Sequence, residues 1–256
     1  LGGSGPTTAS MTSDPQTAAT PRLRISEIFG PTVQGEGALI GRPTVFVRTG
    51  GCDYRCHWCD TPFAVLPEYR DQWRTWETAA VLEEVDRVAG GPVLVSLSGG
   101  NPALQDLGPL IRAGRERGHA FALETQGSSA PAWLGELDHL TLSPKGPSSG
   151  HLTTLWEVEA CLAAAGGGPG GGPATVLKIV VFDGEDYRYA RELAGNYPEL
   201  AVYLQVGNPM PEGEPDPGEL MARYRWLAGQ ALADRWYAAT VLPQLHVLAW
   251  GNARGV

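Results

Sequence analysis

The sequence predicts an α/β fold in which a parallel sheet forms a partial (incomplete) TIM-like barrel of about six strand–helix units. Short β-rich apolar runs alternate with stretches whose apolar residues have helical spacing, which is typical of parallel strands joined by crossover helices. Six units are fewer than the eight of a closed barrel. Several polar motifs come directly after a β-rich run, and active sites of such sheets lie at the carboxyl ends of the strands.

The β-rich runs are short and bounded by polar residues, and we expect each to form one strand. They span residues 44–48, 93–97, 120–123, 139–142, 175–182 and 202–206. Between them, apolar residues three and four positions apart predict helices, most clearly at 79–88 and 104–111.

Residues 22–256 are expected to form a single domain. Residues 1–21 are rich in Gly, Ser, Thr, Ala and Pro without hydrophobic periodicity, which predicts a disordered leader. Residues 166–173 contain six glycines and two prolines, and residues 208–218 are acidic and proline-rich. Neither segment can bury enough apolar area to offset its chain entropy, so we expect two flexible loops there.

Composition favours a small-molecule partner. The net charge of -9 argues against a broad phosphate-binding surface and so against direct nucleic-acid binding. No run approaches the roughly 18 apolar residues of a membrane span, and no secretory signal opens the chain. Three of the four cysteines lie within eight residues, a spacing suited to one metal centre rather than to a disulfide scaffold. These features predict a cytoplasmic protein.

The three clustered cysteines, Cys52, Cys56 and Cys59, have the spacing C-x3-C-x2-C. Three thiolates on a short loop suit a [4Fe–4S] cluster that has one iron free of protein ligands. Zinc prefers four protein ligands in a structural site, and His57 offers a fourth, so zinc remains an alternative. The remaining Cys161 lies in an apolar helical stretch and is expected to be a buried small hydrophobe.

A second motif, residues 98–102, follows the predicted strand 93–97 and reads Ser-Gly-Gly-Asn-Pro. Paired glycines at this point allow the backbone to approach a ligand closely. A tight strand–helix turn would account for the same residues. Because the motif follows the cysteine loop by some forty residues, the ligand-binding interpretation is favoured.

From the cysteine loop onward the chain resembles the radical S-adenosylmethionine (SAM) superfamily. Within it, the chain looks like the 7-carboxy-7-deazaguanine synthase family over residues 23–256. The matching segments are 25–37, 45–48, the cysteine loop through Thr61, 124–127, 143–145, 203–208, 242–246 and 250–256.

The resemblance implies a radical SAM core and an enzyme that converts 6-carboxy-5,6,7,8-tetrahydropterin to 7-carboxy-7-deazaguanine with loss of ammonia. It implies a [4Fe–4S] cluster, SAM that is used catalytically, Mg2+, and a reductant such as flavodoxin or ferredoxin. It also implies a homodimer and a product that feeds 7-deazapurine pathways such as queuosine biosynthesis.

The resemblance also implies roles for individual residues, and the chemistry of several of these side chains suits those roles. Gln34 and Glu36 can hydrogen-bond the edge of a pterin ring, and Arg48 can hold a carboxylate in a bidentate fork. A hydroxyl at Thr61 suits Mg2+. Taken alone, an arginine such as Arg48 is more often a surface ion-pair partner, and a threonine such as Thr61 is more often a helix N-cap. The expected substrate-binding residues are Val33, Gln34, Gly35, Glu36, Arg48, Ser98 and Val256. The expected SAM-binding residues are Trp58, Asp60, Gly100, Glu124, Gln126, Ser143, Pro144, Lys145 and Gln205.

Two other assignments remain open. His246 and Trp250 fall in matching segments, but packing of the last strand and turn explains them equally well. A glycyl-radical activating enzyme shares the C-x3-C-x2-C spacing, although it would not need residues 33–37 or Thr61. A zinc-stabilised module that binds tRNA or protein without catalysis is the alternative from another class, and the acidic charge counts against it.

Overall fold

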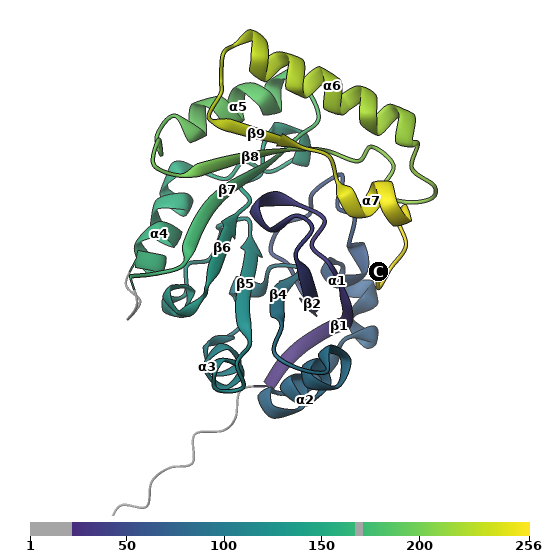
Figure 1. The fold of residues 1–256 in the computed structure, drawn as a ribbon, viewed down its shortest axis with the longest axis vertical. Helices are drawn as coiled ribbons and strands as arrows, with labels where there is room; N and C mark the ends of the chain where they lie inside the picture. The colour runs from purple at the N-terminus through teal and green to yellow at the C-terminus, as the bar shows by residue number, and fades with distance from the viewer. Residues whose placement is uncertain (1–21, 167–170) are drawn as a thin grey trace, which may run out of the picture.

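The computed structural model describes residues 22–166 and 171–256, and within these ranges nine strands form one open sheet. The predicted leader, 1–21, and the centre of the predicted loop at 166–173 lie outside the described residues. The strand order is β3-β1-β2-β4-β5-β6-β7-β8-β9. From β2 to β9 neighbouring strands are parallel, whereas β1 is antiparallel to both β2 and β3. Figure 1 shows the sheet curving as an incomplete barrel, as predicted.

All six predicted strands are present, with ends that shift by one or two residues. The strands are β1 (Arg22–Val33), β2 (Pro43–Thr49), β3 (Arg74–Glu77), β4 (Leu94–Gly99), β5 (Ala120–Thr125), β6 (His139–Leu142), β7 (Ala174–Val181), β8 (Ala201–Val206) and β9 (Ala239–Leu242). Sequence patterning missed β1, β3 and β9. The last two have only four residues each and the first is interrupted by two irregularities in register, so none has a clean strand pattern.

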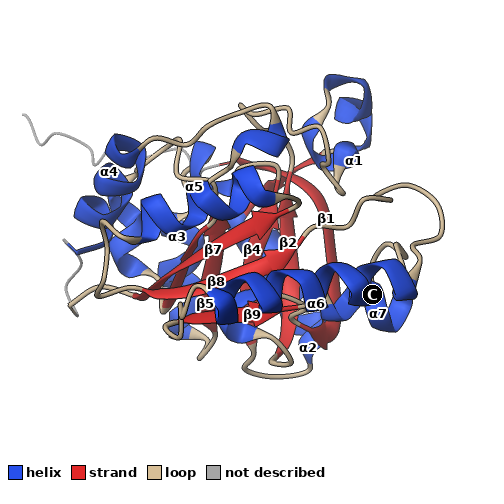
Figure 2. Cartoon of the chain, turned by 90° about the horizontal axis from the view of Figure 1, so that it is seen from above, coloured by secondary structure: helices blue, strands red, loops and turns tan. Residues whose placement is uncertain are grey.

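The connecting helices lie along the outside of the curved sheet, as Figures 1 and 2 show for α3 to α6. The helices are α1 (Pro62–Val65), α2 (Thr78–Ala89), α3 (Gly108–Glu116), α4 (Leu155–Gly166), α5 (Gly184–Ala194), α6 (Pro217–Ala233) and α7 (Leu245–Trp250). Short 3-10 turns are η1 (Gly37–Leu39), η2 (Pro67–Gln72), η3 (Pro102–Leu104), η4 (Ala132–Glu136) and η5 (Pro147–Ser149).

Two helix boundaries differ from the sequence expectation. The helix expected at 104–111 begins only at Gly108, because Pro102 and Pro109 divide the stretch into η3 and α3. The loop expected at 208–218 ends at Asp216, whose side chain accepts a hydrogen bond from the Gly218 amide and caps α6. Among the described residues, no helix is long and apolar enough to cross a membrane.

The main core lies between the sheet and the outer helices. In strand β7, alternate side chains point toward the core and toward the inner side of the sheet. Leu177, Ile179 and Val181 belong to the core cluster, whereas the alternate residues Lys178 and Val180 line a cavity on the inner side. Because side chains alternate across a strand, the inner side of the barrel carries polar groups while the outer side stays apolar.

Candidate active site

A cavity of about 290 Å3 opens on the inner side of the sheet. Its lining comes from two opposing walls. One wall is the cysteine loop and the adjoining glycine loop, 98–102. The other consists of Val33 at the end of β1 and residues 34–36 directly after it, together with α7 and the chain's last residues. The polar inner residues of β2, β4, β5 and β7 form the floor between the two walls, so segments far apart in sequence converge on one space.

The cysteine loop is fastened to the fold mainly through its backbone. The Gly51 amide donates to the Ala64 carbonyl at 2.7 Å, and the His57 amide donates to the Ser149 carbonyl at 3.0 Å. The Arg55 amide donates to His151 Nε2 at 2.8 Å. These bonds leave the side chains of Cys52, Cys56 and Cys59 free to line the cavity. All four cysteines are free thiols, and Cys161 is fully buried as predicted.

The three thiols are not drawn together as they would be in a structural zinc site. A tetrahedral zinc site with bonds of about 2.3 Å draws its sulfurs to within roughly 3.8 Å of one another. Among the described His, Cys, Asp and Glu side chains, one group of three has its ligand atoms within 4.8 Å of one another: Glu36, Asp60 and His246. The three cysteine sulfurs do not form such a group. The thiols are therefore spaced more widely.

His57 also fails to complete a zinc site. Its ring packs against Gly150, where an added Cβ would lie 2.7 Å from the ring, and His57 does not line the cavity with the cysteines. Burial raises the pKa of the Cys56 thiol to about 11 and also raises the pKa of Cys52 and Cys59. A cationic metal centre would therefore have to displace the three thiol protons as it binds.

The glycine loop lies directly against the cysteine loop. The Asn101 amide donates to the Gly51 carbonyl at 2.8 Å, and a Cβ on Gly100 would lie 2.0 Å from that carbonyl oxygen. Only glycine fits at this contact, so Gly100 presents bare backbone to the cavity beside the thiols. That cradle suits close approach of a cofactor such as SAM.

Sequence reasoning missed a polar network behind the cysteines. The Asp53 carboxylate accepts hydrogen bonds from Asn101 Nδ2 at 3.1 Å and from Gln126 Nε2 at 2.8 Å. Asn101 Oδ1 in turn accepts from the Thr125 hydroxyl at 2.9 Å. Asn101 is fully buried and its side chain is thus occupied in fixing Asp53, next to Cys52. Three separate strand ends are joined by this network, which no local motif could indicate.

The residues expected to bind SAM divide into two groups. Trp58, Asp60, Gly100, Glu124, Gln126 and Lys145 line the cavity. Ser143, Pro144 and Gln205 are not among its lining residues within the described ranges, and their SAM contacts stay predictions. Ser143 instead accepts two hydrogen bonds from Lys145 Nζ, through its carbonyl at 2.8 Å and its hydroxyl at 2.9 Å. Gln205 accepts from the Gly37 amide at 3.4 Å and donates to the Leu242 carbonyl at 3.3 Å.

On the opposite wall, Val33, Gln34, Gly35 and Glu36 all line the cavity. Glu36 is held from two sides: Gln244 Nε2 donates to Oε1 at 2.6 Å, and the buried Lys178 forms an ion pair with Oε2. Burial alone would raise the pKa of Glu36, but Lys178 and the nearby His246 outweigh it and hold that pKa well below its usual value. Glu36 is therefore a buried, ionised acceptor.

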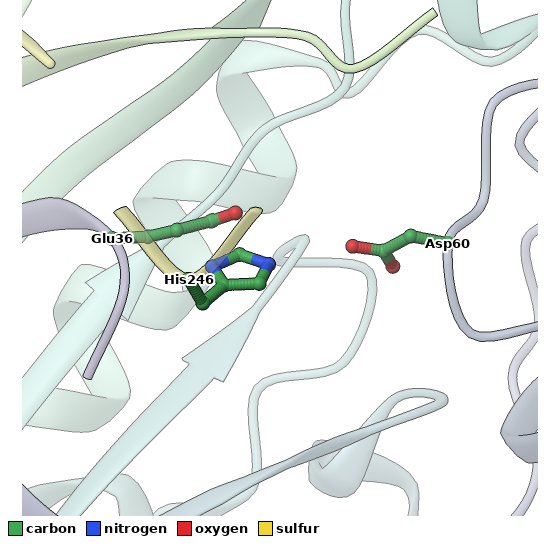
Figure 3. Close-up of side chains that lie close together, drawn as sticks. All are labelled: Glu36, Asp60 and His246. Carbon is green, nitrogen blue, oxygen red and sulfur yellow. The ribbon is translucent and has the colours of Figure 1, made fainter. Parts of the chain in front are cut away.

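His246 reaches the cavity from the first turn of α7. Its ring lies against Gly35, where a Cβ would come within 2.2 Å of Nδ1, so the glycine makes room for the histidine. Figure 3 shows Asp60 pointing across the cavity toward Glu36 and His246. Each Glu36 oxygen has one partner, Lys178 or Gln244, and keeps a further lone pair for a ligand in the cavity. Trp250, 42% exposed, is not among the lining residues described.

Arg48 and Ser98 stand on the floor of the cavity. Arg48 Nε donates to Glu27 Oε1 at 2.8 Å, and both side chains are largely buried, at 17% and 15% exposure. Arg48 therefore does form an ion pair, as the alternative role would require. It lines the cavity, however, and does not lie on the outer surface. The buried Ser98 hydroxyl has no hydrogen-bond partner in the structure. An unpaired buried hydroxyl is costly, which suggests a ligand partner for it.

Thr61 and Val256 both line the cavity. Thr61 occupies the N-cap position of α1, but its side chain makes no capping hydrogen bond; the hydroxyl lies 3.7 Å from Cys59 Sγ. The carboxyl-terminal segment passes close to α1, where the Arg254 guanidinium stacks 3.7 Å from the centre of the Phe63 ring. The chain end is thereby brought to the mouth of the cavity.

Comparison with known proteins agrees with this geometry. Residues 46–195 match the Radical SAM superfamily. The 7-carboxy-7-deazaguanine synthase of Bacillus cereus is 39% identical over 241 residues, covering 92% of this chain and 99% of the relative. That of Pyrobaculum aerophilum is 32% identical over 254 residues, covering 93% and 99%.

Solved structures show the same fold. The crystal structure of QueE from Escherichia coli superimposes with a TM-score of 0.66 at 23% identity, over 88% of this chain and 95% of that one. Streptococcus suis SuiB bound to S-adenosylmethionine gives a TM-score of 0.53 at 14% identity, over 77% and 50%. The second match is limited to half of a larger protein and speaks only to the shared core.

Proposed function

Because the chain belongs to the 7-carboxy-7-deazaguanine synthase family of the radical SAM superfamily, we propose that it converts 6-carboxy-5,6,7,8-tetrahydropterin to 7-carboxy-7-deazaguanine with loss of ammonia. One observation supports this most strongly. The three thiols and the glycine cradle face a wall of hydrogen-bonding groups across a single cavity of about 290 Å3. Such a cavity can hold a reactive cofactor and a small planar substrate in contact.

The cofactors of this reaction would occupy the first wall. Cys52, Cys56 and Cys59 would hold a [4Fe–4S] cluster, with SAM beside Gly100 and Lys145. When bound, the cluster and SAM together supply a 5′-deoxyadenosyl radical that abstracts hydrogen. The cavity's role is to position both reactants and to exclude water. A reductant such as flavodoxin or ferredoxin would supply the electron.

The substrate would lie against the opposite wall and the floor. Ionised Glu36 would accept hydrogen bonds from the ring's N–H donors, since a charged acceptor binds such donors more strongly than a neutral one. Arg48 would bind the substrate carboxylate while Glu27 fixes its orientation. The unpaired Ser98 hydroxyl would gain a partner from the ligand.

Mg2+ belongs to the same proposal. Thr61 offers a hydroxyl that is not used for helix capping, and the carboxylate of Asp60 next to it faces the substrate wall. Hard oxygen donors of this kind suit Mg2+. Mg2+ held by these residues would supply positive charge beside the substrate and offset negative charge that develops in the reaction. We further propose a homodimer in the cytoplasm; the four free thiols favour a reducing compartment.

Turnover of two related pterins tests the proposal. Anaerobically reconstituted protein is incubated with SAM, reductant, Mg2+ and either 6-carboxytetrahydropterin or the same pterin without its carboxylate. We expect 7-carboxy-7-deazaguanine, detected by mass spectrometry, from the first and no deazapurine from the second. An inert carboxylated pterin in the presence of an intact cluster would refute the proposed reaction, and colourless protein with one bound zinc would refute the cofactor.

A further inference from the structure

Lys178 is a buried cation that no sequence motif indicated. The chain contains 17 arginines but only two lysines, Lys145 and Lys178, and both line the cavity. Lys178 is only 2% exposed. An ammonium group at such a depth requires partners of opposite charge, because burial without them is very costly. Lysine, whose ammonium group is a more compact charge than a guanidinium, therefore occurs in this chain only at the cavity.

The partners of Lys178 are two carboxylates from different elements. The ammonium group forms ion pairs with Glu36, which follows β1, and with Glu124 on β5, at 2.5 Å from Oε1 of the latter. Glu36 and Glu124 both line the cavity. A single cation on β7 therefore fixes the relative placement of two acidic side chains from separate parts of the fold.

We propose that Lys178 is a positioning residue that holds Glu36 and Glu124 together as a pair of ionised carboxylates, so that both accept hydrogen bonds from the N–H edge of the substrate. The identity of that substrate rests on the proposed function. The charge arrangement itself rests only on the contacts among the three side chains. If either glutamate takes up a proton, one of its oxygens becomes a hydrogen-bond donor and the group becomes a weaker acceptor.

The other charged groups near this pair cannot replace Lys178. Lys145 influences Glu124, while His246 and Asp60 lie near Glu36, but none of them contacts both carboxylates. Burial alone would lower the pKa of Lys178, yet Glu124 and Glu36 outweigh it and the pKa lies above its usual value. Lys178 is therefore charged throughout the physiological range. Without it, the Glu36 carboxylate would keep the cost of burial and would lose its cationic partner, which favours protonation of Glu36.

Removal of the Lys178 cation should reverse the way in which Glu36 makes the stability of the fold depend on pH. In the wild-type protein the pKa of folded Glu36 is depressed, so its stabilising contribution is present above the unfolded value and is lost only as pH falls through the low folded pKa. In a Lys178→Met variant Glu36 stays buried but loses the cation that lowers its pKa, so the folded pKa of Glu36 rises above the unfolded value. That variant should therefore gain stability, relative to wild type, as the pH falls from about 8 to about 5.

Thermal unfolding tests the charge pairing without any need for activity. Cluster-loaded wild type, Lys178→Met, and the double variant Lys178→Met/Glu36→Gln are compared at several pH values. Arg112→Met is a matched control, because it breaks an exposed ion pair with Glu136. We expect the melting-temperature deficit of Lys178→Met to shrink as pH falls, and the double variant to lose that dependence. A deficit that is equal at all pH values, or unchanged in the double variant, would overturn the inference.

Kinetics test the positioning role. At neutral pH, Lys178→Met should reduce kcat/KM for product formation by about 100-fold, the scale expected when a buried charge loses its partner. Its activity should recover partly as pH rises, and Lys178→Arg should restore part of it at neutral pH. A loss that is the same at every pH would mean a merely structural role. If wild-type protein forms no product, the proposed function fails, whereas the unfolding experiment still decides the charge pairing.

Discussion

The Arg254 guanidinium lies 2.8 Å from the Glu27 carboxylate, joining the end of the chain to its first described strand. The second oxygen of the same carboxylate binds Arg48 at 2.8 Å. Glu27 thus connects the carboxyl-terminal segment with the arginine proposed to bind the substrate carboxylate. Because the sheet is open, this contact draws the last residues across from the β9 side to β1.

Loss of this connection should weaken substrate binding. Glu27→Gln removes the charge that both arginines share, so we expect the KM for the pterin to rise about fivefold to tenfold, with a smaller change in kcat. Arg254→Ala should produce a smaller rise, because this arginine is 43% exposed and solvent screens its ion pair. Steady-state kinetics provide the measurement. Arg223→Ala, which breaks a surface pair with Glu219, is the control; an equal rise there would refute the specific role of Glu27.

The chain end itself should be sensitive to extension. Val256 lines the cavity, and we propose that this end of the chain contacts the substrate's guanidine-like edge. An affinity tag added after Val256 should raise the KM at least about tenfold, on the scale of a lost charged partner. The same tag before residue 1 should leave the KM unchanged. A lower melting temperature without a selective rise in KM would indicate that the terminus serves stability alone.

Variants of the three cavity cysteines should lose iron, whereas a variant of Cys161 should keep it. Cys52→Ala, Cys56→Ala and Cys59→Ala should each prevent stable cluster assembly and abolish SAM cleavage, because a cubane needs all three protein ligands here. Cys161→Ala is the matched control: its thiol donates to the Gly127 carbonyl at 3.3 Å and is fully buried. Its removal should cost about 1 kcal/mol of stability and no iron. Iron loss in Cys161→Ala together with retention in any of the other three would contradict the ligand assignment.

Thr61 should govern the response to Mg2+. Thr61→Ala removes a hydroxyl that makes no capping bond, so folding and iron content should be preserved. Turnover should slow, and its stimulation by added Mg2+ should weaken. Thr61→Ser, which keeps the hydroxyl, should remain close to wild type. An unchanged Mg2+ titration in Thr61→Ala would place the metal elsewhere.

Much of the fold could be predicted from the sequence because parallel strands between crossover helices leave a clear local pattern. The residues of the cysteine and glycine loops were found for the same reason: their spacing is local. Glu27 was missed because its role depends on Arg254, 227 residues away, and no local pattern relates them. Lys178 was hidden in a strand identified only as apolar. The scarcity of lysine in this chain was the one signal that could have found it.

The position of a residue at a strand end does not by itself fix the direction of its side chain. Ser143 and Gln205 both stand where the sequence placed them, at the carboxyl ends of β6 and β8. Their side chains nevertheless bond Lys145, Gly37 and Leu242 within the fold. A motif can locate a residue at the active-site end of a sheet, but the packing of neighbouring segments decides which way its polar atoms face.

We propose that one cavity brings SAM, used catalytically, into contact with a carboxylated pterin. The most direct test counts molecules in one anaerobic reaction of cluster-loaded protein with 6-carboxytetrahydropterin, Mg2+, reductant and a limiting amount of SAM. Mass spectrometry measures the 7-carboxy-7-deazaguanine formed and the SAM consumed. We predict product in clear excess over SAM consumed, and none when SAM is left out. SAM cleaved to 5′-deoxyadenosine without any deazapurine would contradict the account.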